Sequence, residues 1–396
     1  MATLTFDQAR SCVLQKVATA VGLLIEQVPL LESNGRVLAS TLSADRDYPP
    51  LARSVRDGFA IRSSDVPGSL TIAGEVRAGE ASTAALAQGE AIEIMTGAPV
   101  PAGADSVVMV EHTVTTGNQV RIDRSIRYGE NISPRGSEAQ QNQALLAVGQ
   151  RIGYTEIALL ATCGHSLVDV FRHLNVAIVA TGDEILDVPE QPADHQIRNS
   201  NAWSLAAQVV RAGASPNLLP VARDVYDQTR ELIERGLESD LLLLSGGVSA
   251  GKYDIVERVL ADLGAEFFFD RVLIQPGQPL VFGQVRGKFF FGLPGNPAST
   301  MVTFEVFARA ALELLSGQRE TTLPITWARL TRDFQQKPGL TRFLPASLDA
   351  RGLELTPVPW KGSADVPAMT RANAYLVTEP DRERWQAGDM IHMLPK

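Results

Sequence analysis

The central third of this chain alternates short apolar runs with longer amphipathic segments, and no other feature restricts its fold as much. Apolar runs typical of buried strands lie at 176–180, 218–221, 240–244 and 289–292. Amphipathic patterns typical of helices lie at 200–212, 227–238, 253–263 and 299–315. Strands that alternate with helices pair in parallel and need helices on both faces of the sheet. We therefore predict a three-layer α/β/α domain at residues 173–320.

A glycine-rich turn follows directly after one of these predicted strands. The segment 240–254 reads D-LLLL-SGGVSAGKY-D, and a helical pattern comes next. Gly246, Gly247 and Gly251 let the backbone turn tightly and approach a ligand, and the first N–H groups of a helix face negative charge. The turn resembles a Walker A sequence, but Tyr253 stands where a Ser or Thr would bind magnesium, which argues against a P-loop NTPase. A phosphate-binding turn is our prediction, and an ordinary connecting loop is the alternative.

Composition excludes several classes of protein. At 396 residues the chain is too long for one typical core, so several domains are expected. A net charge of −9 and a pI near 5.2 argue against a protein whose main work is binding nucleic acid or an anionic membrane. No apolar stretch reaches the ~20 residues of a membrane span, and the first residues lack the pattern of a signal peptide. We therefore expect a cytoplasmic protein.

Cysteine and histidine give no sign of a transition-metal site. Cys12 and Cys163 are too few for a disulfide framework or a cysteine zinc site, and we interpret them as buried thiols. The five histidines are scattered without ligand spacing.

The flanking regions have a different character from the centre. Thr5 and Gln8 have capping-box spacing and start a predicted helix. Residues 46–140 contain short alternating or apolar runs and predict a β-rich module, whereas residues 1–45 and 141–172 predict a helical stem for it. Beyond residue 321, strand-like runs of even spacing predict a small β-barrel, which we expect to be partial.

Polar turns follow the predicted strands of the centre, and their positions predict a pocket. In an open α/β sheet, ligands bind outside the carboxyl ends of the strands. We therefore expect these turns to rim one site. They lie at 181–184, 223–224, 245–247, 275–279 and 293–299.

Four carboxylates fall in or beside these turns. Acidic side chains next to an anionic ligand repel it unless a divalent cation lies between them, and magnesium prefers oxygen ligands and bridges phosphates. Each acid taken alone is better explained as a helix cap or a solvated charge. Together they predict a magnesium site made from Asp183, Glu184, Asp224 and Asp254.

Six short sequences along the chain form a recognisable series. They are VRDGFA at 55–60, MTGAPVP at 95–101, GAD at 103–105, TGDE at 181–184, SGGVS at 245–249 and LPGNP at 293–297. In this order and spacing they resemble those of the molybdopterin molybdenumtransferases, the molybdenum insertases of the MoeA and gephyrin E-domain type. The resemblance extends over essentially the whole chain.

The resemblance implies an enzyme that inserts molybdate into adenylylated molybdopterin, with magnesium-dependent cleavage of the adenylate, and releases molybdenum cofactor and AMP. It implies that the central domain binds molybdopterin and that the β-rich module closes the active site of the partner subunit in a homodimer. A molybdopterin adenylyltransferase and molybdoenzyme acceptors are the further partners that it suggests.

The resemblance also implies roles for individual residues. Catalytic roles fall to Asp57, Thr96, Glu184, Asp224 and Asp254, with magnesium at Asp224 and Asp254 and molybdate at Ser299, Arg342 and Ser363. The implied molybdopterin-binding residues are Thr181, Gly182, Asp183, Ser245, Gly246, Gly247, Ser249, Lys252, Gln275, Gln278, Pro294, Gly295, Asn296 and Pro297. Hydroxyl groups and a cation suit a tetrahedral oxyanion.

The chain departs from the family at one loop. The family usually has two lysines in a K-P-G-K-P sequence, and here both positions are glutamine, Gln275 and Gln278. A glutamine donates hydrogen bonds but carries no charge, so we expect weaker oxyanion binding unless Arg56, Arg271 or Lys252 restores positive potential.

Two alternatives to an active insertase therefore stay open. One is a catalytically weakened molybdopterin-binding or scaffolding homologue. The other is an enzyme that acts on another adenylylated or nucleotide substrate. The sequence is silent on molybdenum against tungsten preference.

Overall fold

The computed structural model describes residues 3–20, 22–79, 85–247 and 255–396, and the chain divides into two compact units. Unit 1 comprises residues 1–39, 148–154 and 167–396, and unit 2 comprises residues 40–147 and 155–166. The finer division into four segments stays a prediction. In the described ranges, every helix is too short or too polar to cross a lipid bilayer.

A six-stranded sheet forms the centre of unit 1. Its strands, in spatial order, are β16 (Ser215–Leu218), β13 (Asn175–Ala180), β17 (Leu241–Ser245), β21 (Lys288–Leu293), β20 (Val281–Val285) and β18 (Glu266–Phe269). The first four are parallel, as the alternation predicts, but β20 and β18 are antiparallel. The prediction of a wholly parallel sheet is therefore wrong at this edge, where a hairpin joins β20 to β21.

The predicted strand at 218–221 is also misplaced. Strand β16 ends at Leu218 instead of beginning there. Pro220 has no N–H to donate to the ladder, and Pro216 is tolerated within β16 because this strand lies at the edge of the sheet.

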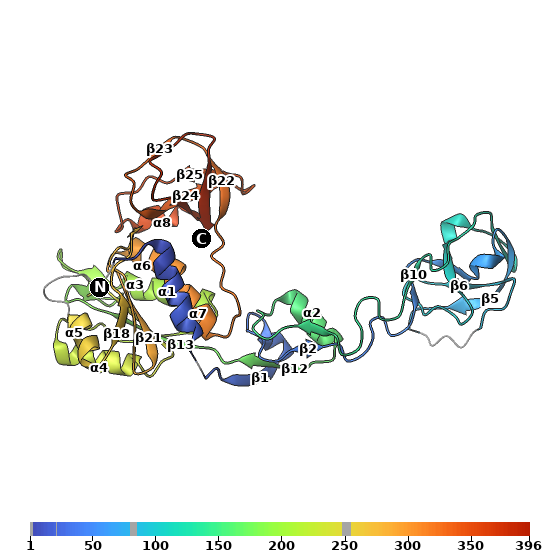
Figure 1. Ribbon diagram of the computed structural model, residues 1–396, viewed down its shortest axis with the longest axis horizontal. Helices are drawn as coiled ribbons and strands as arrows, with labels where there is room; N and C mark the ends of the chain where they lie inside the picture. The colour runs from blue at the N-terminus through green and yellow to red at the C-terminus, as the bar shows by residue number, and fades with distance from the viewer. Residues whose placement is uncertain (1–2, 21, 80–84, 248–254) are drawn as a thin grey trace. The chain divides into compact units, whose positions relative to one another are not determined.

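Helices cover both faces of this sheet, which confirms the three-layer prediction (Figure 1). One face packs on α1 (Phe6–Ala18), α3 (Ser200–Arg211), α6 (Pro297–Thr303) and α7 (Arg309–Leu315), with a π-helical turn at Phe304–Ala308. The other packs on α4 (Tyr226–Gly236) and α5 (Ile255–Asp262). Successive strand residues divide between the two cores: Ile178 and Leu243 lie in the first, Val179 and Leu244 in the second. These strands are apolar throughout because both of their faces are buried.

The first helix begins as its sequence predicts. The Thr5 side chain accepts the N–H of Gln8, and the Gln8 side chain accepts the N–H of Thr5, which completes the capping box. Phe6 then packs edge-on against Phe307, with ring centroids 5.6 Å apart, so α1 is fixed to the α/β layers of unit 1.

A closed five-stranded barrel follows α7. Its strands are β22 (Thr326–Leu330), β24 (Thr341–Leu348), β25 (Glu354–Pro357), β26 (Ala374–Thr378) and β28 (Met390–Pro395). We expected a partial barrel, but the pairing of β24 with β26 closes it. The short strand β19 (Ile274–Gln275), which belongs to the α/β domain by sequence, pairs in parallel with β24.

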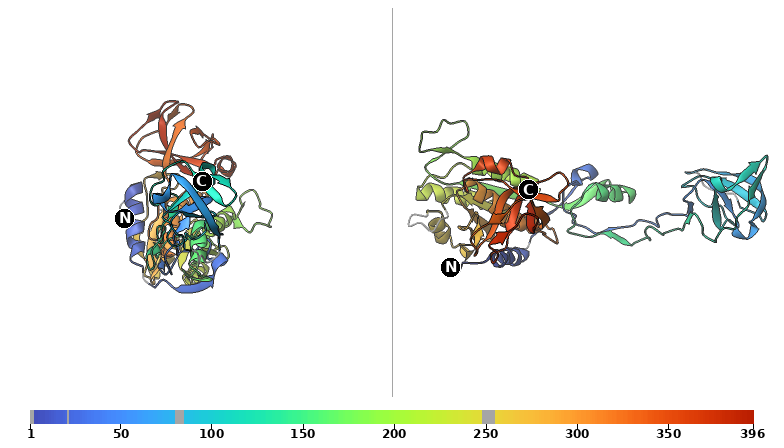
Figure 2. Two further views of the ribbon diagram at one scale, coloured as in Figure 1. Left: turned by 90° about the vertical axis from the view of Figure 1, so that its right-hand side faces the viewer. Right: turned by 90° about the horizontal axis from the view of Figure 1, so that it is seen from above.

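Unit 2 contains its own six-stranded sheet, drawn in blue and cyan in Figure 2. In spatial order the strands are β7 (Ser106–Met109), β4 (Gly58–Ile61), β6 (Glu90–Ile94), β5 (Gly68–Val76), β9 (Gln119–Ile122) and β8 (Val114–Thr116). The helix α2 (Tyr154–Thr162) falls mostly in this unit. The sheet confirms the prediction of a β-rich module in this region.

The remaining elements are short. They are β1 (Ile25–Pro29), β12 (Leu167–Phe171), β2 (Leu42–Ser43), β11 (Ala144–Leu146), β3 (Arg53–Ser54), β10 (Ile132–Ser133), β14 (Ile185–Leu186), β15 (Ile197–Arg198), β23 (Phe334–Gln335), β27 (Arg384–Trp385), α8 (Val366–Thr370) and 3-10 turns at Leu30–Ser33, Ser63–Asp65 and Val110–His112.

Gly58→Ala is expected to destabilise unit 2 by about 3 kcal/mol or more, because the new methyl group would clash with the backbone of the paired strand β7. A Cβ atom on Gly58 would lie 1.8 Å from the carbonyl oxygen of Val108 on the neighbouring strand. All four tryptophans of the chain lie in unit 1. The unfolding temperature of unit 2, followed by far-ultraviolet circular dichroism, should therefore fall. The unfolding temperature of unit 1, followed by tryptophan fluorescence, should stay unchanged.

Gly74→Ala in β5 is the matched control, because no heavy atom lies within 4 Å of the added methyl group. It should unfold like the wild type or slightly later. Equal effects of the two substitutions would contradict the packing explanation.

Candidate functional site

Three of the predicted turns meet because the parallel strands are in register. Ala180 pairs with Ser245, and Ser245 pairs with Leu293. The Thr181 N–H donates to the Ser245 carbonyl at 3.0 Å, and the Gly246 N–H donates to the Leu293 carbonyl at 3.2 Å. The carboxyl ends of β13, β17 and β21 are thus joined by backbone hydrogen bonds.

Glycine is required where these turns cross. Gly246 and Gly247 have φ values of 90° and 62°, which favour glycine. A Cβ on either residue would also lie 2.7 Å from an oxygen of Thr181. The close approach of the two turns therefore depends on both glycines.

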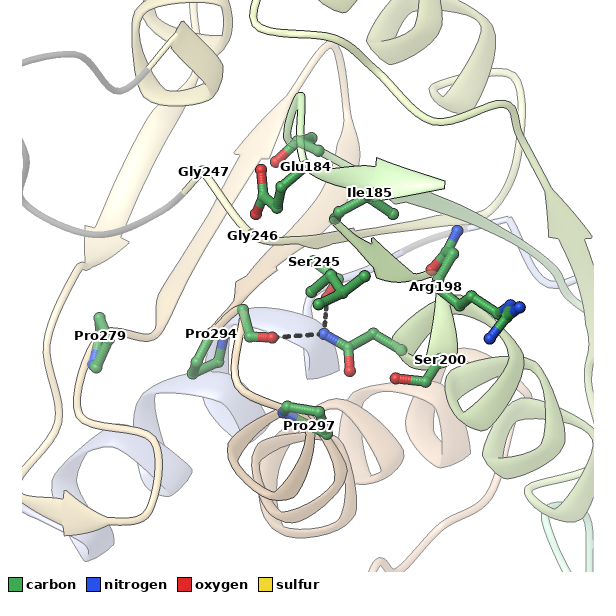
Figure 3. Close-up of a pocket in the computed structure, with 15 residues that line it drawn as sticks. Glu184, Ile185, Arg198, Ser200, Ser245, Gly246, Gly247, Pro279, Pro294 and Pro297 are labelled. Atoms are coloured by element: carbon green, nitrogen blue, oxygen red, sulfur yellow. Dashed lines mark hydrogen bonds between the residues drawn. The ribbon is translucent and has the colours of Figure 1, made fainter. Parts of the chain in front are cut away.

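A pocket of about 230 Å³ opens at this edge of the sheet (Figure 3). Eight of the residues predicted to act in catalysis or to bind molybdopterin line it, and a ninth lining residue, Pro279, comes from the predicted 275–279 turn. The eight are Thr181, Glu184, Ser245, Gly246, Gly247, Pro294, Gly295 and Pro297. The pocket thus brings together four of the five predicted turns.

The sequence interpretation missed one wall of this pocket. That wall consists of Ile185, Ile197, Arg198, Asn199, Ser200 and Asn201. It comes from the parallel pair β14 and β15 and from the first turn of α3. The Asn199 side chain accepts the N–H of Ala202 as the cap of α3, so the polar run before the predicted helix was the available signal.

Asn201 links the turns that form the floor of the pocket. Its Nδ2 donates to Ser245 Oγ at 2.9 Å and to the Gly295 carbonyl at 2.7 Å, the two dashed lines in Figure 3. Among the described residues, Asn201 Oδ1 and Thr181 Oγ1 are buried without a hydrogen-bond partner. Buried polar groups of this kind need water or a ligand.

The charges of Asp183 and Glu184 act on Asp224 near the pocket. The Asp224 N–H donates to Asp183 Oδ1 at 3.0 Å, and Arg223 donates to the Asp183 and Ile185 carbonyls. Burial, and then the charges of Asp183 and Glu184, raise the pKa of Asp224. The negative charges therefore act on one another, but within the described ranges these acids are not arranged as a group of three or more side chains that could hold a metal ion.

Arg342 is a buried cation without an anion. Its side chain is 7% exposed, and burial lowers the pKa of its guanidinium. Nε donates to Gln275 Oε1 at 2.7 Å and Nη1 donates to the Leu340 carbonyl at 3.3 Å. Burial is the one effect resolved on this pKa, and no carboxylate in the described part of the chain pairs with Arg342. An uncompensated buried charge is costly, so the site favours an anion.

The other residues predicted to bind molybdate lie in the same neighbourhood. A Cβ on Gly277 would lie 3.7 Å from the carbonyl oxygen of Ser299. The N–H of Ala298 donates to the Ser363 carbonyl at 2.9 Å, which fixes the loop that carries Ser363 to the start of α6. The 275–279 turn therefore contacts Arg342 through Gln275 and passes close to Ser299 at Gly277, while the Ser363 loop is bonded to the start of α6.

The predicted catalytic pair of unit 2 is in direct contact. The Thr96 N–H donates to Asp57 Oδ1 at 2.6 Å, and this bond lowers the pKa of Asp57. Both side chains are exposed. The contact keeps Asp57 ionised.

Several predicted residues make no contribution to the pocket lining. They are Gly182, Asp183, Asp224, Gln275, Gln278 and Asn296. Ser249, Lys252 and Asp254 fall outside the described residues. Of the three candidates for replacement charge, Arg56 and Arg271 are exposed, and Lys252 again lies outside the described ranges.

Comparison with known proteins gives matches over nearly the whole chain. Residues 4–164 match the model of the MoeA N-terminal region (domain I and II), residues 177–314 match a probable molybdopterin binding domain, and residues 327–396 match the MoeA C-terminal region (domain IV).

Individual relatives match over similar lengths. Molybdopterin molybdenumtransferases of Staphylococcus epidermidis and Staphylococcus aureus are 33% identical over 377 residues, which is 93% of this chain and 90% of each relative. The crystal structure of the molybdopterin biosynthesis MoeA protein from Pyrococcus horikoshii OT3 is 26% identical and superposes with a TM-score of 0.86 over 100% of both chains.

Asp224→Asn is expected to keep or raise the Tm of the ligand-free protein near neutral pH. The pKa of Asp224 is raised in the fold, so its ionised form opposes folding. This cost begins as the pH rises through the ordinary aspartate pKa of about 3.9 and is complete above the raised value. The Tm difference between variant and wild type should therefore disappear at acidic pH.

Asp349→Asn is the control of opposite sign. Hydrogen bonds from the Glu354 backbone, Arg351 and the Leu353 backbone lower the pKa of Asp349 to about 2, so its ionised form stabilises the fold near neutral pH. This variant should lower the Tm. A Tm for Asp224→Asn as low as that for Asp349→Asn would refute the repulsion at Asp224.

Proposed function

Because this chain belongs to the MoeA family of molybdopterin molybdenumtransferases, we propose that it catalyses the insertion of molybdate into adenylylated molybdopterin. The products are molybdenum cofactor and AMP, and the reaction cleaves the phosphoanhydride of the adenylate. The enzyme is a transferase of molybdenum cofactor biosynthesis.

The buried guanidinium of Arg342 is the observation that carries this proposal. It is a positive charge, 7% exposed and unpaired by any carboxylate in the described part of the chain. A tetrahedral dianion such as molybdate supplies the missing charge. Ser299 lies in the first turn of α6, and the loop of Ser363 is bonded to the start of that helix, so their hydroxyl groups would offer the compact donors that an oxyanion needs.

The pocket between the sheet edge and α3 suits the organic substrate. The Ser245–Gly247 turn and the 294–297 turn bring backbone close to the ligand, as phosphate binding requires. Thr181 lines the same pocket and is followed in the chain by Gly182 and Asp183, and Ser249 and Lys252 would add further contacts to the substrate. Together these groups would hold the pterin and its phosphates, and the neighbouring turn with Gln275 and Gln278 would face the oxyanion.

The carboxylates fit a magnesium ion by their chemistry. Asp224 would bind it, together with Asp254, since the charges crowded around Asp224 favour a cation and magnesium usually takes one or two carboxylates plus phosphate oxygens. A magnesium ion held there would supply positive charge that neutralises the phosphates of the adenylate. Glu184, at the pocket wall, would orient the adenylate.

We also assign a role to unit 2 through the dimer. Asp57, held by the Thr96 N–H, would complete the active site of the partner subunit in a homodimer. The reaction would take place in the cytoplasm. A molybdopterin adenylyltransferase would supply the substrate, and molybdoenzymes would accept the product.

The pure protein is expected to release AMP and form active cofactor when incubated with adenylylated molybdopterin, magnesium and molybdate. The assay measures AMP by chromatography and cofactor by activation of a cofactor-free molybdoenzyme. Absence of AMP would favour a binding or scaffolding homologue instead. AMP without cofactor would indicate a different adenylate hydrolase, and tungstate in place of molybdate would test metal preference.

Two inactive variants are expected to complement each other if unit 2 acts on the partner subunit. A mixed dimer of Asp57→Asn and Arg342→Met keeps one intact site, so refolded equimolar mixtures should recover about a quarter of wild-type activity. Mixing Asp57→Asn with Thr96→Ala is the control, because every site then keeps one defect. Equal activity in both mixtures would show that the site forms within one chain.

A further inference from the structure

Gln275 makes a contact that its neutral side chain would not suggest. Its Oε1 accepts the Nε–H of Arg342 at 2.7 Å. We propose that Gln275 is a positioning residue, which holds the guanidinium of Arg342 in the orientation that binds the oxyanion. This role rests on the proposed function. The amide of Gln275 would orient the guanidinium of Arg342, which is a buried positive charge of the site.

The backbone places the two side chains next to each other. Strand β19 pairs in parallel with β24, and Gln275 lies opposite Arg342 in the register. The Thr341 N–H donates to the Leu273 carbonyl at 3.1 Å and fixes this register. Residues opposite each other on neighbouring strands project to the same face of the sheet. The contact is therefore built into the junction between the α/β domain and the barrel.

The chemistry of the two groups determines which way the amide points. A guanidinium donates only, so the amide oxygen of Gln275 must face Nε and its NH₂ group must point away. The Nε–H of Arg342 thus donates to Gln275, and Nη1 donates only a long hydrogen bond of 3.3 Å to the Leu340 carbonyl. Among the described residues, Nη2 has no partner and remains for a ligand.

A neutral acceptor is suited to this task. A carboxylate at position 275 would orient Arg342 but cancel its charge, whereas a lysine would add charge but offer no acceptor. Glutamine orients the guanidinium and leaves its charge intact. The loop thus binds the oxyanion in a different way from a loop with lysines. It holds one guanidinium in a fixed orientation instead of adding a second positive charge.

Gln275→Met tests this role in the full-length enzyme, since methionine keeps the length of the side chain but removes the acceptor. The KM for molybdate should rise about tenfold, the loss expected for one hydrogen bond to a charged group, while kcat changes less than about twofold. Gln335→Met is the matched control, because Gln335 Nε2 donates to Glu383 Oε1 at 3.1 Å in the barrel and its loss leaves Arg342 untouched.

A second measurement reads the contact without activity. In proton–nitrogen spectra, the arginine Nε–H signal that Arg342→Lys removes belongs to Arg342. In the wild type this signal should exchange slowly with solvent, and in Gln275→Met it should shift and exchange at least about tenfold faster. In Gln335→Met it should stay unchanged.

The outcomes separate the two proposals. A wild type that releases no AMP contradicts the proposed function, and the Nε–H signal still decides whether Gln275 orders Arg342. An unchanged molybdate KM in an active Gln275→Met enzyme overturns the positioning role. A raised KM with an unaltered Nε–H signal overturns it as well, because Gln275 would then act by another route.

Discussion

The parallel register of β13, β17 and β21 is the constraint on which the site depends. These strands are buried on both faces, so each residue contributes to one of two cores, and a shift by one position would exchange the two sets. The same register puts Thr181, Gly246 and Pro294 at one edge of the sheet. Packing in the interior therefore determines the geometry of the pocket at the rim.

Much of this arrangement was predictable because it is local. Thr181, Ser245 and Pro294 follow apolar runs whose length and flanking glycines mark them as strands, and strand ends meet at one edge. Residues on the opposite wall escaped prediction because their position depends on long-range pairing. Ile197 and Arg198 reach the pocket only through the pairing of β15 with β14.

Non-local pairing also explains the other differences. Closure of the barrel requires β24 to pair with β26, which lies about thirty residues further along the chain. The antiparallel edge of the sheet forms because a hairpin joins β20 to β21 and β18 then pairs with β20. The apolar sequences of these strands do not reveal in which direction a strand runs. The contact of Gln275 with Arg342 depends on the pairing of β19 with β24, which lie far apart in the sequence. The sequence therefore shows that two lysines are replaced by glutamine, but it does not show that Gln275 contacts Arg342.

The site contains charged side chains that no neighbouring group of opposite charge neutralises within the described residues. The charges of Asp183 and Glu184 act on Asp224, and Arg342 is buried without a carboxylate partner in the described part of the chain. Both features oppose folding, and under the proposed function both would be relieved by ligands of opposite charge, a cation at the acids and an oxyanion at the guanidinium. Function at this edge of the sheet thus has a cost in stability.

Calorimetric titration of the ligand-free protein with molybdate tests the oxyanion site most directly. The wild type should bind molybdate, and Arg342→Met should bind it at least tenfold more weakly, about the effect of one charged hydrogen bond, with a Tm no lower than that of the wild type. Equal Kd values for the two proteins would contradict the account, because the buried cation would then have no part in binding the anion.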